Sequence, residues 1–253
     1  MLELDFNSDL GESFGLYTMG DDLAVLPHIT SANIACGFHA GDARTMRATV
    51  ARAAELGVAI GAHPGLPDLQ GFGRRNMRIT PDEAYEFVLY QVGALLGFTR
   101  AAGVPLCHVK AHGALYNMAA TDKPLAAAIC QAVKDVDPAL ALYGLANSAL
   151  TEAAEGLGLR VAHEVFADRT YQQDGTLTPR QQPGAMITDL NQAIEQVLSM
   201  VREGYAPSMQ GTRVPVQAGT LCIHGDQPGA VAFALGIRQA LEREGVVVRS
   251  PRP

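Results

Sequence analysis

Side chains that transfer protons, stabilise an oxyanion or bind a cation recur in short clusters along this chain. Each cluster closes or directly follows a short apolar run, as polar residues do where a strand leads into a loop. The clusters are formed by Asp5, Asn7, Asp9 and Glu12; by His39 and Asp42; by His63; by Lys110 and His112; by Glu164, Asp168 and Arg169; and by His224 and Asp226. Carboxylates and imidazoles of this kind activate water, and a cationic group beside them holds negative charge.

The elements that must position these clusters are strands alternating with helices. Segments of helical period separate the apolar runs, and their start signals include Asp42 and the sequence Thr80-Pro81-Asp82-Glu83. The predicted strands are residues 2–6, 34–36, 58–62, 106–110, 139–143, 160–165 and 220–224. Because strands joined by helices pair in parallel, seven such units in 253 residues favour a TIM-like (β/α) barrel formed as one domain by residues 1–253. An open, doubly wound sheet is the alternative.

In a (β/α) barrel the carboxyl ends of the strands meet at one face, so these clusters should converge there. Each residue also has an ordinary structural interpretation. Asp9 and Glu12 could cap a helix, and Lys110 could form a salt bridge with Asp5 or Glu164. An arginine of the loop at 67–75, such as Arg74, could simply be solvated. Several polar groups directed at one mouth nevertheless need a ligand or mutual pairing to offset their desolvation.

The composition excludes several classes of function. The formal net charge is −7 and no basic block occurs, which argues against a nucleic-acid partner. No run of about 18 apolar residues and no signal-like start is present, so we expect no membrane association and a cytoplasmic location. The four cysteines lack CxxC spacing and are expected to be reduced core residues. Neither GxGxxG after the first strand nor GxxxxGK[ST] occurs, so any ATP must bind differently or elsewhere.

Longer stretches of the sequence closely resemble the LamB/YcsF family, in the same order along nearly the whole chain. They are DFNSDLGES at 5–13, SANIACGFHAGD at 31–42, GAHPGLPD at 61–68, GFGRR at 71–75, VKAHGALYN at 109–117, EVFADRTY at 164–171, DGTLTPRQQPGA at 174–185 and LCIHGDQPGA at 221–230. The resemblance implies a barrel of the glycoside hydrolase/deacetylase type. It also implies a role in a three-component 5-oxoprolinase that uses ATP to hydrolyse 5-oxoproline to L-glutamate, with subunits B and C as partners.

The resemblance implies that a group of motif residues forms the functional site, but it assigns no individual role to any of them. They are Asp9, His39, His63, Lys110, His112, Asp168, Arg169, His224 and Asp226. As hypotheses, the catalytic residues are Asp9, Lys110, His112, His224 and Asp226, with a carboxylate or histidine activating water and Lys110 stabilising the oxyanion. The substrate-binding residues are Asn7, His39, Arg74, Asp168 and Arg169, with an arginine holding the carboxylate of 5-oxoproline. ATP binds on this chain or on the partners.

Two rival functions remain open. The first is a metal-dependent deacetylase or amidohydrolase, because Asp9, His39 and His63 are acceptable ligands for zinc or another divalent ion. The second is a component that binds a ligand and delivers it to partners without catalysis. Metal analysis tests the first, and tight binding without turnover in any combination of components would favour the second.

Overall fold

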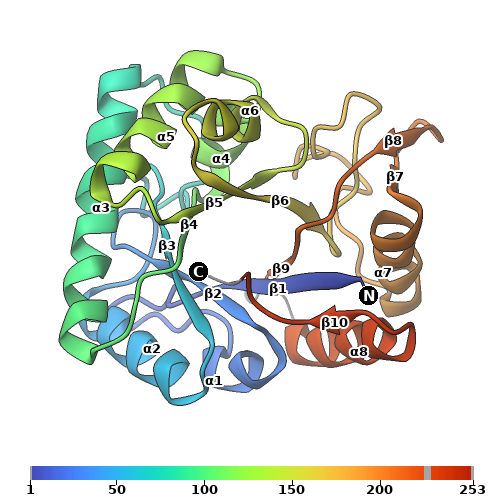
Figure 1. The fold of residues 1–253 in the computed structure, drawn as a ribbon, viewed down its shortest axis with the longest axis horizontal. Coiled ribbons are helices and arrows are strands. Elements are labelled where there is room, and N and C mark those ends of the chain that lie inside the picture. The colour runs from blue at the N-terminus through green and yellow to red at the C-terminus, as the bar shows by residue number, and fades with distance from the viewer. Residues whose placement is uncertain (1, 225–228, 252–253) are drawn as a thin grey trace.

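Parallel strands surrounded by helices form a closed barrel in the computed structural model, which describes residues 2–224 and 229–251 (Figure 1). The barrel strands are β1 (Glu3–Leu10), β2 (Ser31–Ala35), β3 (Ala59–His63), β4 (His108–Lys110), β5 (Ala141–Leu145), β6 (Arg160–Phe166) and β9 (Thr220–His224). They pair in that order, and β9 pairs with β1. This last pairing confirms the seven-stranded (β/α) barrel and excludes the open sheet.

Helices cover the outside of the barrel, and local signals in the sequence fix where they begin. They are α1 (Asp22–Val25), α2 (Ala43–Glu55), α3 (Pro81–Ala102), α4 (Gly113–Ala119), α5 (Lys123–Val136), α6 (Ala149–Gly156), α7 (Leu190–Leu198) and α8 (Ala230–Arg243), with short helical turns η1 (Leu26–His28) and η2 (Ser199–Glu203). Asp42 caps α2, and Thr80 forms a capping box with Glu83 at the start of α3. Both predicted starts are confirmed.

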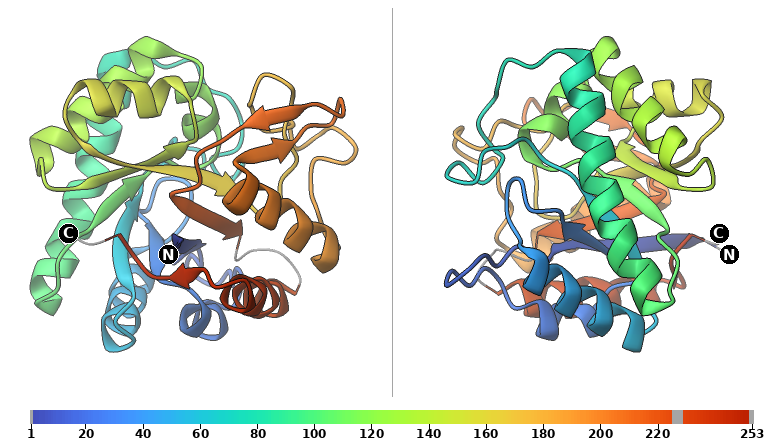
Figure 2. Two further views of the ribbon diagram at one scale, coloured as in Figure 1. Left: turned by 45° about the vertical axis from the view of Figure 1, so that its right-hand side comes forward. Right: turned by 90° about the vertical axis from the view of Figure 1, so that its left-hand side faces the viewer.

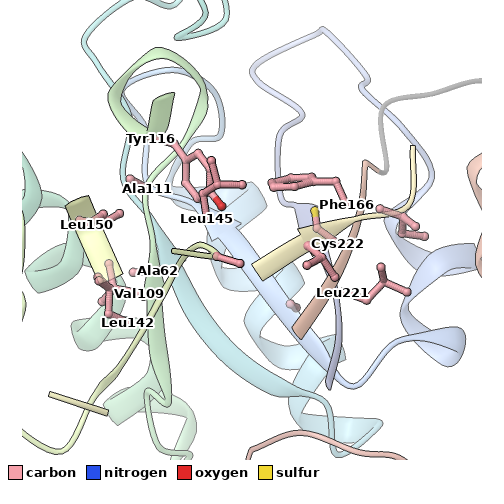
Figure 3. Packing of buried hydrophobic residues seen from close by; sticks show 14 of the residues in the cluster. Ala62, Val109, Ala111, Tyr116, Leu142, Leu145, Leu150, Phe166, Leu221 and Cys222 are labelled. Carbon is pink, nitrogen blue, oxygen red and sulfur yellow. The ribbon is translucent and has the colours of Figure 1, made fainter. Parts of the chain in front are cut away.

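The apolar core lies between the strands and the helices. Figure 3 shows Val109 of β4, Leu142 of β5 and Leu150 of α6 packed together, and all three are buried. Inside the barrel the side chains are largely polar, with Asn33 and His108 among those buried there. This division leaves the apolar layer to stabilise the fold and the barrel interior to carry hydrogen bonds.

Three features differ from the sequence-based expectations. The first strand runs to Leu10 instead of Phe6, so Asn7 and Asp9 lie within it. Polar residues can occupy a strand here because their partners on neighbouring strands satisfy them inside the barrel. An antiparallel pair, β7 (Tyr205–Pro207) and β8 (Arg213–Pro215), lies outside the seven strands predicted from the sequence. A short strand β10 (Val247–Val248) also extends the sheet beside β1.

Loops at the carboxyl ends of the strands form one face of the molecule. In the right-hand view of Figure 2, the segments that follow β1, β3 and β6 project together beyond the carboxyl end of β1. The convergence expected for a barrel is therefore present. Within the described ranges, no helix is long and apolar enough to cross a membrane.

Candidate active site

A cavity of about 650 Å³ opens among the carboxyl ends of the strands and the loops that follow them. Strand residues line its floor, and the loops after β3 and β6 line its sides. The predicted site residues that line it are Asp9, His63, Arg74, Lys110, His112, Arg169 and His224. Tyr116, Leu145 and Phe166 add an apolar portion, which Figure 3 shows with the ring of Phe166 near Tyr116.

Lys110 lies at the floor of this cavity and is only 2% exposed. Its Nζ lies 3.0 Å from Asp9 Oδ1 and 2.9 Å from Glu164 Oε1, and it also donates to Cys222 Sγ at 3.0 Å. Burial alone would lower the pKa of Lys110, but its interactions with Asp9, Cys222 and Glu164 raise it well above its usual value. The lysine is therefore a fixed ammonium group. The salt bridge between Lys110 and Glu164, expected if the lysine had a structural role, is present. The alternative bridge to Asp5 is not formed, and Lys110 pairs with Asp9 instead.

Asp9 connects the lysine to the histidines of the site. Its Oδ2 lies 3.3 Å from His63 Nε2, while its Oδ1 accepts from Lys110 and from Asn33 Nδ2. Burial opposes ionisation, yet the charges of His63 and Lys110 hold the pKa of Asp9 well below its usual range. Asp9 is thus a carboxylate whose oxygens are both engaged.

Asn7 lies two residues before Asp9 on β1 and does not line the cavity. Its Nδ2 donates to Glu164 Oε1 at 3.0 Å and to Thr220 Oγ1 at 2.6 Å, and its Oδ1 accepts from Lys110 at 3.2 Å. The structure therefore places this candidate substrate-binding residue beneath the floor, where it orients Lys110 and Glu164.

His224, which pairs with Asp9 across β9 and β1, forms an oriented pair with Asp168. His224 Nδ1 donates to Asp168 Oδ2 at 2.7 Å, and the backbone N–H of His224 donates to the same oxygen at 3.2 Å. Burial raises the pKa of Asp168, but the charge of His224 outweighs this effect and holds the pKa below its usual value. Asp168 does not line the cavity, whereas His224 does, so the carboxylate fixes the ring and leaves Nε2 as the nitrogen available for proton transfer.

Three histidines and a carboxylate meet on the remaining side. The rings of His39 and His112 stack at 3.7 Å between centroids, and His39 Nε2 lies 3.3 Å from Glu12 Oε1. Burial is the main cause that lowers the pKa of His39 and His112 well below the usual value. His39 is fully buried behind His112 and does not line the cavity.

Backbone carbonyls set the tautomers of two of these rings. His63 Nδ1 lies 2.8 Å from the carbonyl oxygen of Lys110, and His112 Nε2 lies 2.8 Å from that of Phe72. A carbonyl accepts only, so both nitrogens must carry hydrogen. The other two nitrogens, His63 Nε2 and His112 Nδ1, are 2.9 Å apart. Two lone pairs at this distance repel, so either a proton or a metal cation lies between them.

The donor set around this point fits a divalent ion of the zinc type. Ligand atoms of Glu12, His39, His63 and His112 all lie within 4.8 Å of one another. Imidazoles with a carboxylate suit zinc, and carbonyls that orient the rings are the usual outer partners of ligating histidines. This set differs from the expected one in that Glu12 and His112 join it, while Asp9 lies at its edge.

A second potential set, Asp9, Cys222 and His224, fits a cation poorly. The ammonium of Lys110 already lies 3.0 Å from both Asp9 Oδ1 and Cys222 Sγ. A metal ion would meet this positive charge directly, and burial raises the pKa of the Cys222 thiol well above its usual value.

Arginines occupy the sides of the cavity. Arg169 is 3% exposed and donates to the backbone carbonyls of Ala185 and Thr178. Arg74 places its guanidinium 4.6 Å from the ring centre of Phe72. The neighbouring Arg75 forms a salt bridge with Asp68 and so serves the loop.

A family model described as the LamB/YcsF family matches residues 4–253. The chain belongs to the LamB/YcsF family. A protein of Bordetella pertussis, named as the A subunit of 5-oxoprolinase, is 66% identical over 247 residues, covering 98% of both chains. One of Bacillus subtilis with the same name is 59% identical over 248 residues, covering 98% of this chain and 96% of that protein.

Among solved structures, the crystal structure of Lactam Utilization Protein from Thermus thermophilus is similar along the whole fold. Its TM-score is 0.92 at 48% identity, covering 99% of this chain and 100% of that chain. The fold described above is thus shared with this lactam utilization protein.

Some site residues of this LamB/YcsF chain were not assigned a role from sequence. Tyr116 and Arg180 line the cavity, and His108 lies inside the barrel, where its Nε2 is 2.7 Å from Asn33 Oδ1. The sequence held one signal for His108. It lies in the same predicted strand as Lys110 and two residues before it, so both side chains should point to the same side of the strand. Asp226, expected to be catalytic, lies outside the described residues.

Proposed function

We propose that this LamB/YcsF chain acts as the A component of a three-component 5-oxoprolinase, opening the lactam ring of 5-oxoproline to give L-glutamate at the expense of ATP. Relatives so named match it over nearly their full length. In the structure, the observation that carries the proposal is the His224–Asp168 pair facing the same cavity as Lys110. An oriented base and a fixed cation in one cavity are what hydrolysis of an amide requires.

In this proposal His224 activates water through Nε2, because Asp168 occupies Nδ1. Lys110 stabilises the negative charge that develops on the carbonyl oxygen, while Asp9 and Glu164 hold its ammonium in place. Arg74 or Arg169 binds the carboxylate of 5-oxoproline at the side of the cavity.

The remaining parts of the proposal concern the assembly. Subunits B and C are the partners, and they bind the ATP, since no phosphate-binding loop motif occurs in this chain. Residues 1–253 act as one barrel domain in the cytoplasm.

A metal-dependent hydrolase is the second candidate, favoured by the opposed nitrogens of His63 and His112. A divalent ion held by Glu12, His63 and His112 would polarise a carbonyl or lower the pKa of a bound water. Metal analysis after dialysis should find about one ion per chain, reduced in His63→Gln and unchanged in His163→Gln, which alters a histidine paired with Glu155 outside the cavity. Full activity of metal-free protein would exclude this candidate.

Reconstitution tests the proposed function. Glutamate formed from 5-oxoproline is measured with and without ATP in a mixture of this chain with subunits B and C, omitting each component in turn. Formation should require every component. His224→Gln should lower the rate by about 10²-fold or more, and His163→Gln should not. Hydrolysis of an acetyl or amide substrate by this chain alone would instead favour the second candidate.

A further inference from the structure

The turn that follows β6 carries two residues of the site next to each other in the chain. Asp168 orients His224, and the next residue, Arg169, lines the cavity with a side chain that is 3% exposed. The residue that orients the proposed base and a cationic group facing the ligand therefore share one piece of backbone. Their relative position is set by this turn.

Hydrogen bonds from a buried glutamine hold the turn in one conformation. Gln196 of α7 donates through Nε2 to the backbone carbonyl oxygens of Phe166 and Arg169, each at 2.9 Å. The backbone N–H of Ile187 donates to the carbonyl oxygen of Asp168, also at 2.9 Å. Because Gln196 is 5% exposed, water competes little for its bonds. The turn thus presents Asp168 and Arg169 in fixed positions, as a selective site requires.

The guanidinium group of Arg169 is held at two of its nitrogens. Nε donates to the carbonyl oxygen of Ala185 at 3.4 Å, and Nη2 donates to that of Thr178 at 2.6 Å. Both acceptors are neutral. Among the described residues, no carboxylate forms a salt bridge with Arg169 and no acceptor binds its Nη1. The group is therefore oriented by the protein, with N–H donors left for a ligand.

The floor of the cavity has the opposite polarity. Lys110 is flanked there by the carboxylates of Asp9 and Glu164, so these three side chains sum to one negative charge. Burial lowers the pKa of Arg169 to about 10, which leaves its guanidinium charged at neutral pH. A carboxylate on the ligand is thus repelled by the floor and attracted to Arg169.

Arg74, the other arginine considered for the carboxylate, has a different setting. It stands on the loop after β3, is only partly buried, and stacks its guanidinium 4.6 Å from the ring centre of Phe72. Charges that are shielded from water interact more strongly with a ligand than exposed ones. Arg169 is therefore the arginine whose contact should differ most between a charged and an uncharged ligand.

We propose that Arg169 determines the specificity of this cavity, so that it accepts lactams with a carboxylate on the carbon beside the ring nitrogen and rejects uncharged lactams. This inference rests on the proposed function and names the residue that selects its substrate class. A neutral ligand would leave the buried N–H donors of Arg169 unpaired, and an unpaired buried donor is what makes such sites discriminate.

Two five-membered ring compounds that contain no lactam test the proposal. Cyclopentanecarboxylate has the ring and the charge, whereas cyclopentanecarboxamide has the ring without the charge. In the complete three-component enzyme, the carboxylate should inhibit glutamate formation at least about tenfold more strongly than the carboxamide. Equal inhibition by the two compounds would overturn the proposal.

The variant Arg169→Gln should abolish this difference between the two inhibitors. It should also lower kcat/KM for 5-oxoproline by about 10²-fold, chiefly through a higher KM. Arg202→Gln is the matched control and should keep the difference, because Arg202 lies on η2 and pairs with Glu244 away from the cavity. A difference that persists in Arg169→Gln would overturn the proposal, and its loss in Arg74→Gln would then assign the carboxylate to Arg74.

Arg169→Lys provides a second test if loss of the bonds to Ala185 and Thr178 unfolds Arg169→Gln, which melting temperatures will show. Lysine keeps the charge without the planar fork, so the preference for the carboxylate inhibitor should fall about threefold or more. An unchanged preference in Arg169→Lys would overturn the proposal. Failure of the proposed function itself would be distinct, since the wild-type mixture would then yield no glutamate.

Discussion

At the scale of residues, the site depends on charges that are buried together and hold one another in place. The clearest case is Lys110 between Asp9 and Glu164, where each of the three side chains is at most 6% exposed. Such an arrangement gives the ammonium group a fixed position at the cavity floor. It also makes the stability of the fold depend on a residue of the site, because neither carboxylate has another lysine or arginine at this distance among the described residues.

Replacing Lys110 by Met should therefore destabilise the protein as well as abolish activity. Two buried carboxylates would be left without their cation, and the expected cost is about 3–5 kcal/mol in the free energy of unfolding. Urea denaturation measures it. Lys123→Met, which breaks an exposed pair with Glu152, is the control and should leave the unfolding midpoint unchanged. A loss below about 1 kcal/mol in Lys110→Met would contradict the assignment of this ion pair network.

Asp168→Asn should change how stability depends on pH. His224 holds the folded-state pKa of Asp168 below the ordinary value of 3.8, so the folded protein binds this proton less tightly than the unfolded chain. The carboxylate thus stabilises the fold above the ordinary value, and this contribution is lost as pH falls through the folded-state pKa. Urea unfolding of both proteins should show the largest difference near neutral pH, shrinking in acid. A difference independent of pH would refute the pairing.

The sequence predicted which residues gather at the site. It did not predict which of them line the cavity and which support it from behind. Their placement after apolar runs located Asp9, His63, Lys110 and His224 at one mouth. Whether a side chain lines the cavity or supports it from behind depends on strand register, which a single sequence does not fix. Asn7 accordingly lies below the floor, as a support for Lys110.

At the scale of elements, register explains the polar interior of the barrel. Gly61 of β3 pairs directly with His108 of β4, and the glycine leaves the space that the imidazole occupies. A Cβ on Gly61 would lie 2.0 Å from His108 Nε2. The ring of His108 also stacks on Tyr143 at 4.0 Å, so it has no other place to go without disturbing β5.

Gly61→Ala should consequently displace His108 and destabilise the barrel by about 1–3 kcal/mol, the usual cost of overpacking a well-packed core. Gly93→Ala in α3 is the matched control, because a Cβ there meets nothing within 4 Å and alanine favours a helix. Thermal unfolding of the two variants should move in opposite directions. Equal melting temperatures would show that β3 and β4 adjust freely.

Elements with strong local signals were predicted from sequence, and weakly marked ones were not. The capping box at Thr80 and the apolar run at 220–224 located α3 and β9 directly. The hairpin of β7 and β8 was missed because its strands are only three residues long, each ends in proline, and neither alternates clearly. Hydrogen bonds between Ser208 and Thr212 close its turn, and such contacts leave little trace in composition.

At the scale of the whole molecule, the barrel is closed by β9 against β1, and the carboxyl-terminal segment adds a further hold on β1. The backbone N–H of Val247 donates to Leu2, and that of Arg249 donates to Leu4. Arg249 also forms a salt bridge with Glu3. Residues 2–4 and 247–249 are thus joined at the face opposite the cavity mouth.

A chain ending at Val246 should still fold, with a lower melting temperature. Loss of two backbone hydrogen bonds costs about 2 kcal/mol, which corresponds to roughly 4–8 °C in a chain of this size. A chain ending at Ser250 is the control and should melt like the full protein. If both truncated chains melted alike, β10 would contribute nothing to closure.

The contrast between strand-borne and loop-borne site residues bears on how this protein can be re-engineered. Lys110, Asp9 and their supports belong to a network in which every position constrains several others, so randomising them mainly yields unfolded variants. Arg74 and Arg180 stand on loops after β3 and β6, whose backbone is not part of the barrel. A library aimed at lactams of other ring size or charge should therefore diversify residues 74–76 and 176–181 and leave the strands unchanged.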